Sequence, residues 1–162
     1  MANTYTLIAS NTVGSGGAAS VTFSSIAGTY TDLVVKCSIS AATANGFFMS
    51  INGSSANLTY RLLEGDGATA ASYNASNGRI AYAFSSSTIF SNVEVYLPNY
   101  AGATNKSFST DAVSEQNSTT AYADLTASLW SQTTAITSLG FSFSTGNIRE
   151  FSTFYLYGIK NS

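Results

Sequence analysis

Two-residue alternation is the feature that most restricts how this sequence can fold, and residues 30–40 show it most clearly. Leu33, Val35, Cys37 and Ile39 occupy alternate positions, and most positions between them are polar. Successive side chains of a β-strand point to opposite faces of the sheet, so the pattern predicts a strand with one buried face. A helix would spread the same residues around its circumference. Cys37 is expected to be buried as a small hydrophobic side chain.

The same alternation returns in short segments along the chain, and none of them has the sustained period of a helix. Expected strands are residues 5–8, 21–23, 30–40, 46–51, 58–63, 79–84, 90–97, 106–115, 120–130, 136–143 and 151–159. Many short strands separated by turn signals are typical of an all-β sandwich or barrel. We therefore expect one domain over residues 1–162: an all-β, two-sheet antiparallel β-sandwich, jelly-roll-like, with little or no helix.

Several segments carry more specific expectations. Residues 11–20 and 68–77 are small and polar, which predicts loops. Residues 151–159 are apolar on both faces, which predicts a strand that is covered on both sides. Asn52–Gly53 predicts a tight turn. Three shared faces are also expected: Ile80, Tyr82 and Phe84 together; Ala123, Leu125, Ala127 and Leu129 inward; and Tyr122, Asp124, Thr126, Ser128 and Trp130 outward.

Low charge is the main peculiarity of the composition. Charged residues make up 9% of the chain, whereas about 25% is usual for soluble domains. Aromatic residues make up 13%, and tyrosine in particular suits a contact surface because it has an apolar ring and a polar end. Few charges and many aromatic residues fit a surface that is covered by protein partners.

The charge pattern argues against two classes of partner. The formal net charge is −2, and the six Lys and Arg residues are scattered singly, so no basic patch for a nucleic acid is expected. No apolar run approaches the length of about 20 residues that a membrane span needs. The first residues lack the features of a signal peptide, so synthesis in a cytoplasm is expected.

The sequence offers little catalytic chemistry. It has no histidine and one cysteine, which removes histidine-dependent nucleophiles, a structural zinc site and an internal disulfide. Paired carboxylates remain a route to hydrolysis, and Asp111, Glu115 and Asp124 lie on two successive expected strands. We interpret these acids as solvated charges, and Gly65–Gly67 as a turn without a calcium site. No enzyme, metal or cofactor is expected.

Aromatic residues are the best candidates for contacts with a partner. Tyr96, Tyr122 and Trp130 lie opposite the expected apolar faces, where a second layer, a partner subunit or a sugar could cover them. Tyr73 and Tyr100 lie in expected loops. Residues 1–10 could add a strand to the sheet of a partner. The candidate interface residues are Tyr5, Leu7, Tyr73, Tyr96, Tyr100, Tyr122 and Trp130.

Four segments resemble a known family. Residues 29–35, 93–100, 105–109 and 152–160 are similar to a family of small virion proteins of tailed bacteriophages, many of them from aquatic and cyanobacterial phages. The similarity runs through the whole chain and rests on strand and turn residues. It implies a β-sandwich component of the virion that has no enzymatic activity and no cofactor.

Two placements in the particle stay open. A capsid decoration (cement) protein would bind the major capsid protein, as trimers, and stabilise the head. A tail or fibre-associated module would bind host-surface glycans, with Tyr73 and Tyr100 as contacts. A compact single domain with low charge and no fibrous segment favours the first placement. A polysaccharide depolymerase is the third alternative.

Overall fold

The computed structural model describes residues 4–117 and 119–160, and this part of the chain contains twelve β-strands and no helix. The strands are β1 (Tyr5–Thr12), β2 (Ser20–Phe23), β3 (Asp32–Ile39), β4 (Asn45–Ile51), β5 (Leu58–Gly65), β6 (Ala70–Ala75), β7 (Arg79–Ala83), β8 (Ser91–Pro98), β9 (Lys106–Ser114), β10 (Tyr122–Trp130), β11 (Leu139–Phe143) and β12 (Thr153–Ile159). The expected all-β class is confirmed.

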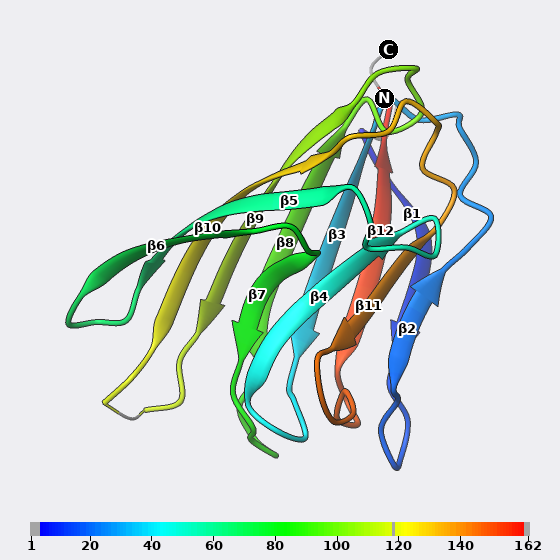
Figure 1. Cartoon of the computed structure of the whole chain (residues 1–162). Helices are drawn as coiled ribbons and strands as arrows, with labels where there is room; N and C mark the ends of the chain where they lie inside the picture. Colours follow the sequence, from blue (N-terminus) through cyan, green and yellow to red (C-terminus); the bar gives the residue numbers. More distant parts are fainter. Residues whose placement is uncertain (1–3, 118, 161–162) are drawn as a thin grey trace.

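The strands form two antiparallel sheets that pack face to face (Figure 1). The 8-stranded sheet has the order β1-β12-β3-β8-β9-β10-β5-β6, and the 4-stranded sheet has the order β2-β11-β4-β7. The chain passes from one sheet to the other at β1–β2, β2–β3, β3–β4, β4–β5, β6–β7, β7–β8, β10–β11 and β11–β12. Together with the orders β1-β12-β3-β8 and β2-β11-β4-β7, these crossings define a jelly roll, as the sequence predicts.

Two hairpins are inserted into this jelly roll. β5 and β6 lie between β4 and β7 in the chain, and β9 and β10 lie between β8 and β11. All four strands join the large sheet beyond β8, where Figure 1 shows them leading away from the small sheet. We call β9, β10, β5 and β6 the extension. The last strand of the small sheet, β7, packs against β9 and β10.

Alternating apolar residues from both sheets fill the core. The inward faces predicted for β3, β4, β8 and β11 are all confirmed, and Cys37 is buried. Phe47 of β4 and Phe141 of β11 lie 6.2 and 5.7 Å, between ring centroids, from Phe154 of β12 in the facing sheet. Ring contacts of this kind add about 0.5–1.5 kcal/mol each beyond the burial of their area.

The tight turn at Asn52–Gly53 is confirmed. Both residues have positive φ, 51° and 78°, as a type I′ turn requires. Ile51 and Ser54, on either side of the turn, exchange two backbone hydrogen bonds of 2.9 and 3.1 Å.

The orientation predicted for residues 120–130 is wrong. In β10 the buried residues are Asp124, Thr126, Ser128 and Trp130, and the exposed residues are Ala123, Leu125, Ala127 and Leu129. The register with β9 explains the reversal, because directly paired residues of antiparallel strands share a face. Phe108 and Ala112 of β9 point into the core, and their partners on β10 are Ser128 and Asp124.

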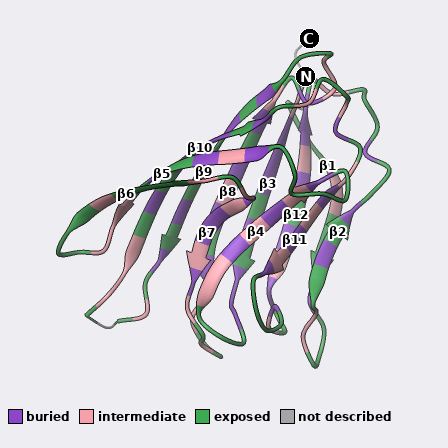
Figure 2. Cartoon of the chain, in the orientation of Figure 1, coloured by how far each residue is buried: buried purple, intermediate pink, exposed green. Residues whose placement is uncertain are grey.

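Two expected loops are partly strand. Residues 70–75 form β6, which pairs with β5, and β1 continues to Thr12. β6 is an edge strand that is largely exposed (Figure 2), so small and polar residues suit it and no alternation marks it.

Two expected faces also differ from the structure. A bulge opposite Phe47 and Phe48 shifts the register of β7, so Ile80 and Ala81 are both buried and Tyr82 is only partly buried. β12 lies between β1 and β3, and its inner face is fully covered, whereas its outer face is covered only in part: Ile159 is buried but Tyr155 is exposed.

The N-terminal strand belongs to the chain's own sheet. Residues 5–12 pair with β12 and form one edge of the large sheet, which agrees with an edge strand and not with a free arm. Ile8 and Ala9 pack against the core. Residues 1–3, the start of the expected arm, lie outside the described residues.

Candidate functional site

The seven candidate interface residues differ in how far they are exposed. Tyr5, Leu7, Tyr73 and Tyr96 are exposed, and Tyr122 is partly buried. Tyr100 and Trp130 are buried, so the expectation that they contact a partner or a glycan is wrong.

Both buried rings have an internal role. Tyr100 is 0% exposed, its hydroxyl donates a hydrogen bond to the carbonyl oxygen of Ala27, and it accepts one of 3.3 Å from the amide of Tyr30. The ammonium nitrogen of Lys106 lies 5.4 Å from the centre of the Trp130 ring. Tyr100 thus holds the loop before β3 in place, and Trp130, the last residue of β10, packs on the inner face with the Lys106 ammonium over its ring.

Tyrosines gather on the outer face of the large sheet near β1. Tyr5 contacts Tyr157 with a centroid distance of 6.2 Å, and Tyr155 stacks on Tyr157 at 6.5 Å. The hydroxyl of Tyr96 donates a hydrogen bond of 2.9 Å to Asp32. This surface is accessible, and its charged side chains include the exposed ion pair of 2.6 Å between Lys36 and Glu94.

An apolar patch covers the outer face of the extension. Leu63 of β5, Leu125 of β10 and Val113 of β9 are 61%, 56% and 47% exposed, and Leu129 completes the patch. Leu63 and Leu125 are direct cross-strand partners, so they form one ridge. The alternation in residues 120–130 does not predict this patch, because Leu125 and Leu129 were expected to point inward.

Grooves flank this ridge on both sides. One groove, of about 520 Å³, has small residues along it, Gly65, Ala70 and Ala123. The other, of about 470 Å³, runs past Ala127 and Arg61. A ridge of leucines between two grooves is a shape that another protein surface can match.

The inner face of the extension is apolar on β5, where Leu58, Tyr60 and Leu62 are buried, but it holds many polar groups on β9 and β10. β9 and β10 bury Lys106, Thr110, Ser114, Asp124, Thr126 and Ser128. β10 therefore has inverted polarity: apart from Trp130 its buried residues are polar, and its aliphatic residues point into water. β9 is mixed, because it also buries Phe108 and Ala112. In the rest of the large sheet the polarity is the usual one.

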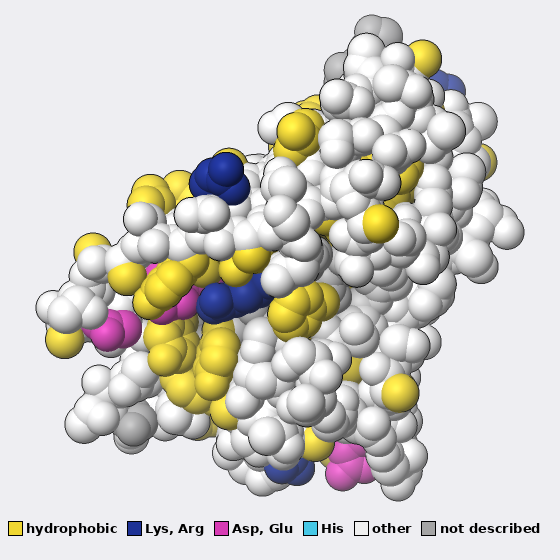
Figure 3. All heavy atoms as spheres, in the orientation of Figure 1, with side chains coloured by type: hydrophobic (Ala, Val, Ile, Leu, Met, Phe, Trp, Pro, Cys, Tyr) yellow, Lys and Arg dark blue, Asp and Glu magenta, His cyan; other side chains and the backbone are white. Residues whose placement is uncertain are grey.

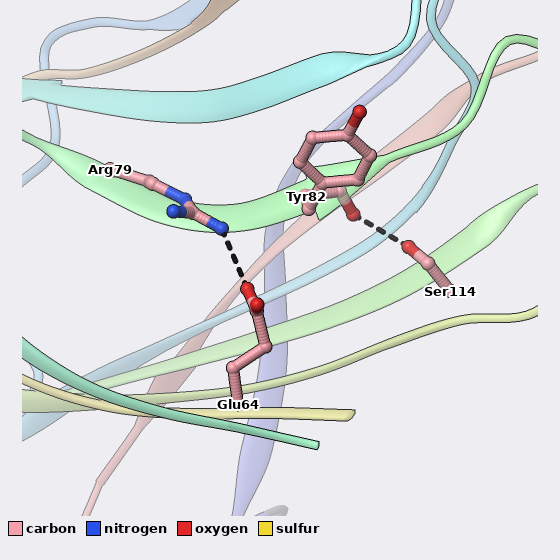
Figure 4. Close-up of polar contacts among 4 residues, drawn as sticks. All are labelled: Glu64, Arg79, Tyr82 and Ser114. Carbon is pink, nitrogen blue, oxygen red and sulfur yellow. Dashed lines mark hydrogen bonds and ion pairs between the residues drawn. The ribbon is translucent and has the colours of Figure 1, made fainter. Parts of the chain in front are cut away.

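Asp124 is the most unusual of these buried groups. It is 4% exposed, and within the described part of the chain neither of its carboxylate oxygens has a hydrogen-bond partner. Its direct neighbour on β5 is Glu64, whose carboxylate forms an ion pair of 3.1 Å with Nη2 of Arg79 (Figure 4). We call the region around Glu64, Arg79, Tyr82, Tyr122 and Asp124 the acidic cleft.

Burial, with the negative charge of Glu64 as the second cause, raises the pKa of Asp124 to about 6. Arg79 and the backbone amide of Tyr82 act in the opposite direction. That amide is near enough to attract the carboxylate but does not reach it in hydrogen-bond geometry. Asp124 is thus a carboxyl group that changes its charge close to neutral pH.

Aromatic rings line the cleft beside these charges. The ring of Tyr122 lies 4.8 Å from Tyr82 and 5.4 Å from Phe84, between centroids. Burial raises the pKa of Tyr122, and its neighbours Tyr82, Glu64, Asp66 and Tyr73 add to the effect. Figure 3 shows acidic, basic and hydrophobic side chains gathered left of centre, between projecting parts of the surface.

The cluster of acids expected from the sequence does not form. Asp111 pairs with Leu125 on the exposed face, whereas Asp124 points inward, and Glu115 is exposed. The solvated character expected of Asp111 and Glu115 is confirmed, and that of Asp124 is wrong. The true neighbour of Asp124 is Glu64, which the sequence could have indicated only through the register of β5.

Two kinds of feature are absent from the described residues: metal-binding clusters and membrane-spanning helices. These residues contain no group of three or more Asp, Glu, Cys or His side chains that could hold a metal ion. Nor does that part of the chain contain a helix able to span a membrane.

Comparison of the chain with models of protein families, with curated protein sequences and with solved structures finds no match in any of the three.

Proposed function

We propose that the chain is a structural protein of a tailed-phage particle, without enzymatic activity, that decorates the capsid by binding the major capsid protein. The observation that carries this proposal is the inverted polarity of β10, whose exposed face is aliphatic. An apolar patch that stays exposed on a well-packed sheet is typical of a surface that binds protein. The resemblance of the sequence to small phage virion proteins supports the same role.

A neighbouring copy of the same chain is the occupant that we propose for the apolar patch. The ridge of Leu63 and Leu125 and the grooves beside it belong to one surface, so the ridge of one copy can enter a groove of the next. Arg61 and Asp111 border the patch with opposite charges. Such a surface favours a closed homo-oligomer, here a trimer.

A decoration protein would stabilise the head by repeating the same contact many times over the capsid lattice. A stable contact needs about 1,000 Å² or more of buried surface, and an anchored aromatic or aliphatic ridge supplies its centre. An oligomer that engages several lattice positions at once binds far more tightly than one copy does. The exposed tyrosines near β1, Tyr5, Tyr96 and Tyr155, remain free for the contact with the capsid.

One observation favours the alternative, a tail or fibre module that binds glycans. Tyr73 is exposed at the acidic cleft near Tyr122, and tyrosine rings beside carboxylates can stack on and hydrogen-bond a sugar. Intact phage particles distinguish the two placements. Decoration predicts density on the capsid lattice in electron cryomicroscopy, with copies on the order of hundreds per particle. Density at the tail, in tens of copies, would refute decoration.

The patch itself can be tested in the purified protein. We expect a trimer by light scattering, and Leu125→Asp should yield monomers because it places a charge on the ridge. Ser38→Asp is the matched control, since it adds the same charge to the exposed outer face of β3. A mass that is unchanged in Leu125→Asp, or lowered equally in both variants, would refute the assignment of the patch.

A further inference from the structure

We propose that the acidic cleft binds one cationic side chain, a lysine or an arginine, of a partner subunit, with Asp124 as its counter-ion. This inference rests on the proposed function only in taking the partner to be another protein subunit. The apolar patch lies on the opposite face of the same strands, so the two surfaces are separate.

The first argument is that Asp124 lacks a partner. A buried carboxylate normally accepts hydrogen bonds or pairs with a cation, because an unpaired buried charge has lost its hydration without compensation. Both oxygens of Asp124 are without a partner among the described residues. Arg79 does not fill this role, since its Nη2 is bonded to Glu64 and its own Nε is also buried without a partner there.

The second argument is the balance of charge around the cleft. The groups that act on it are the carboxylates of Glu64, Asp66 and Asp124, the guanidinium of Arg79, and the phenols of Tyr73, Tyr82 and Tyr122. Asp66 accepts hydrogen bonds from Ala68 and Thr69 within its own turn, and Glu64 pairs with Arg79, so Asp124 is the carboxylate left without a cation. A cleft with walls of low dielectric constant concentrates the resulting negative potential. The missing group is a cation.

The third argument is that aromatic rings favour an organic cation over a neutral sugar. Tyr82, Phe84 and Tyr122 pack against one another, so none presents the full open face on which a sugar ring stacks. A single ammonium or guanidinium group is smaller than a sugar ring and needs the face of one ring within about 6 Å of its centroid. A metal ion is disfavoured, because no group of three suitable ligands occurs among the described residues.

The same sheet face already holds one cation of its own. Lys106 is 2% exposed, lies over the Trp130 ring and donates to the carbonyl oxygens of Gln132 and Thr134. Lys106 and Trp130 lie at one end of the β9–β10 pair, and Asp124 lies towards the other. The fold thus accommodates a cation beside an aromatic ring at one end and leaves the corresponding position at Asp124 to a partner.

A titration followed by NMR tests the inference on the isolated protein. The probe is Nα-acetyl-arginine methylamide, and Nα-acetyl-citrulline methylamide is its neutral counterpart of nearly equal size. At pH 7.5 we expect the arginine probe to shift the amide resonance of Tyr82 with a Kd of about 1–10 mM, and the citrulline probe to bind at least about tenfold more weakly. Binding should weaken below pH 6, where Asp124 takes up a proton.

Three variants make the test specific. Asp124→Asn should abolish the preference for arginine, and Glu64→Gln should also do so because it frees Arg79 to pair with Asp124. Asp111→Asn, which removes an exposed carboxylate from the other face of β9, should leave the Kd unchanged within about twofold. Equal binding of both probes, equal effects of Asp111→Asn and Asp124→Asn, or cleft shifts caused by N-acetylglucosamine in place of arginine would each overturn the inference. Absence of the chain from capsids would refute decoration alone.

Discussion

Replacing Asp124 by Asn should make the protein more stable at neutral pH, although it alters a buried residue. In the folded chain the pKa of this carboxyl is about 6, against 3.8 for the free group. The folded state therefore holds the proton more tightly than the unfolded chain does. The stabilisation from this group is complete below pH 3.8 and is lost as the pH rises to about 6.

The shift sets the size of the effect. Each pKa unit corresponds to about 1.4 kcal/mol, so two units give an upper limit of about 3 kcal/mol. Water at the mouth of the cleft screens part of this, and the asparagine amide is itself left without a partner. We therefore expect Asp124→Asn to raise the free energy of unfolding by about 1–2 kcal/mol at pH 7.5 and to change it little at pH 4.

Urea denaturation of both proteins between pH 4 and pH 8 measures this difference. Asp111→Asn is the control, and its exposed carboxyl should change the free energy of unfolding by less than about 0.5 kcal/mol at any pH. A loss of stability of 1 kcal/mol or more in Asp124→Asn at pH 7.5 would show that the carboxylate is paired in the folded chain. The reasoning on the acidic cleft would then fail.

Three further outcomes follow from the packing, each measured by chemical denaturation. Tyr100→Phe should lower the free energy of unfolding by about 1–2 kcal/mol, since it removes the buried hydroxyl that bonds the backbone of Ala27 and of Tyr30. Gly158→Ala should lower it by about 1–3 kcal/mol because a Cβ there would lie 2.3 Å from the Tyr30 ring, whereas Gly65→Ala, with open space around it, should be nearly neutral. Deleting residues 1–10 should unfold the protein or strongly lower its midpoint, because β1 pairs with β12; a folded protein of unchanged stability would contradict this.

Strands with one apolar face could be predicted from the sequence. In β3, β4, β8 and β11 the residues of the hydrophobic core occupy alternate positions. Because alternate side chains lie on the same face of a strand, the pattern shows which face is buried. β6 has no large apolar set, because an edge strand with two exposed faces buries little. Nothing in residues 68–77 therefore marks a strand.

The orientation predicted for β10 was wrong for a different reason: both faces of this strand carry apolar residues. Leu125 and Leu129 suggest one orientation, and Trp130 suggests the other. The choice depends on the register with β9, where Phe108 and Ala112 mark the inward face. Pairing of strands is a property of the folded sheet, so the position of Asp124 and the acidic cleft could not be predicted from β10 by itself.

Both candidate surfaces have one structural cause, which is the extension of the large sheet beyond the small one. Over β1, β12, β3 and β8 the small sheet supplies a second layer, and an apolar inner face is required. Beyond β8 the strand of the small sheet that chiefly packs against the extension is its edge strand β7, so the inner face of β9 and β10 can hold polar groups such as Asp124. The leucines of β10 are then free to point outward, where another subunit can bury them. The two inserted hairpins therefore carry both the apolar patch and Asp124, the features on which the proposed contacts between subunits depend.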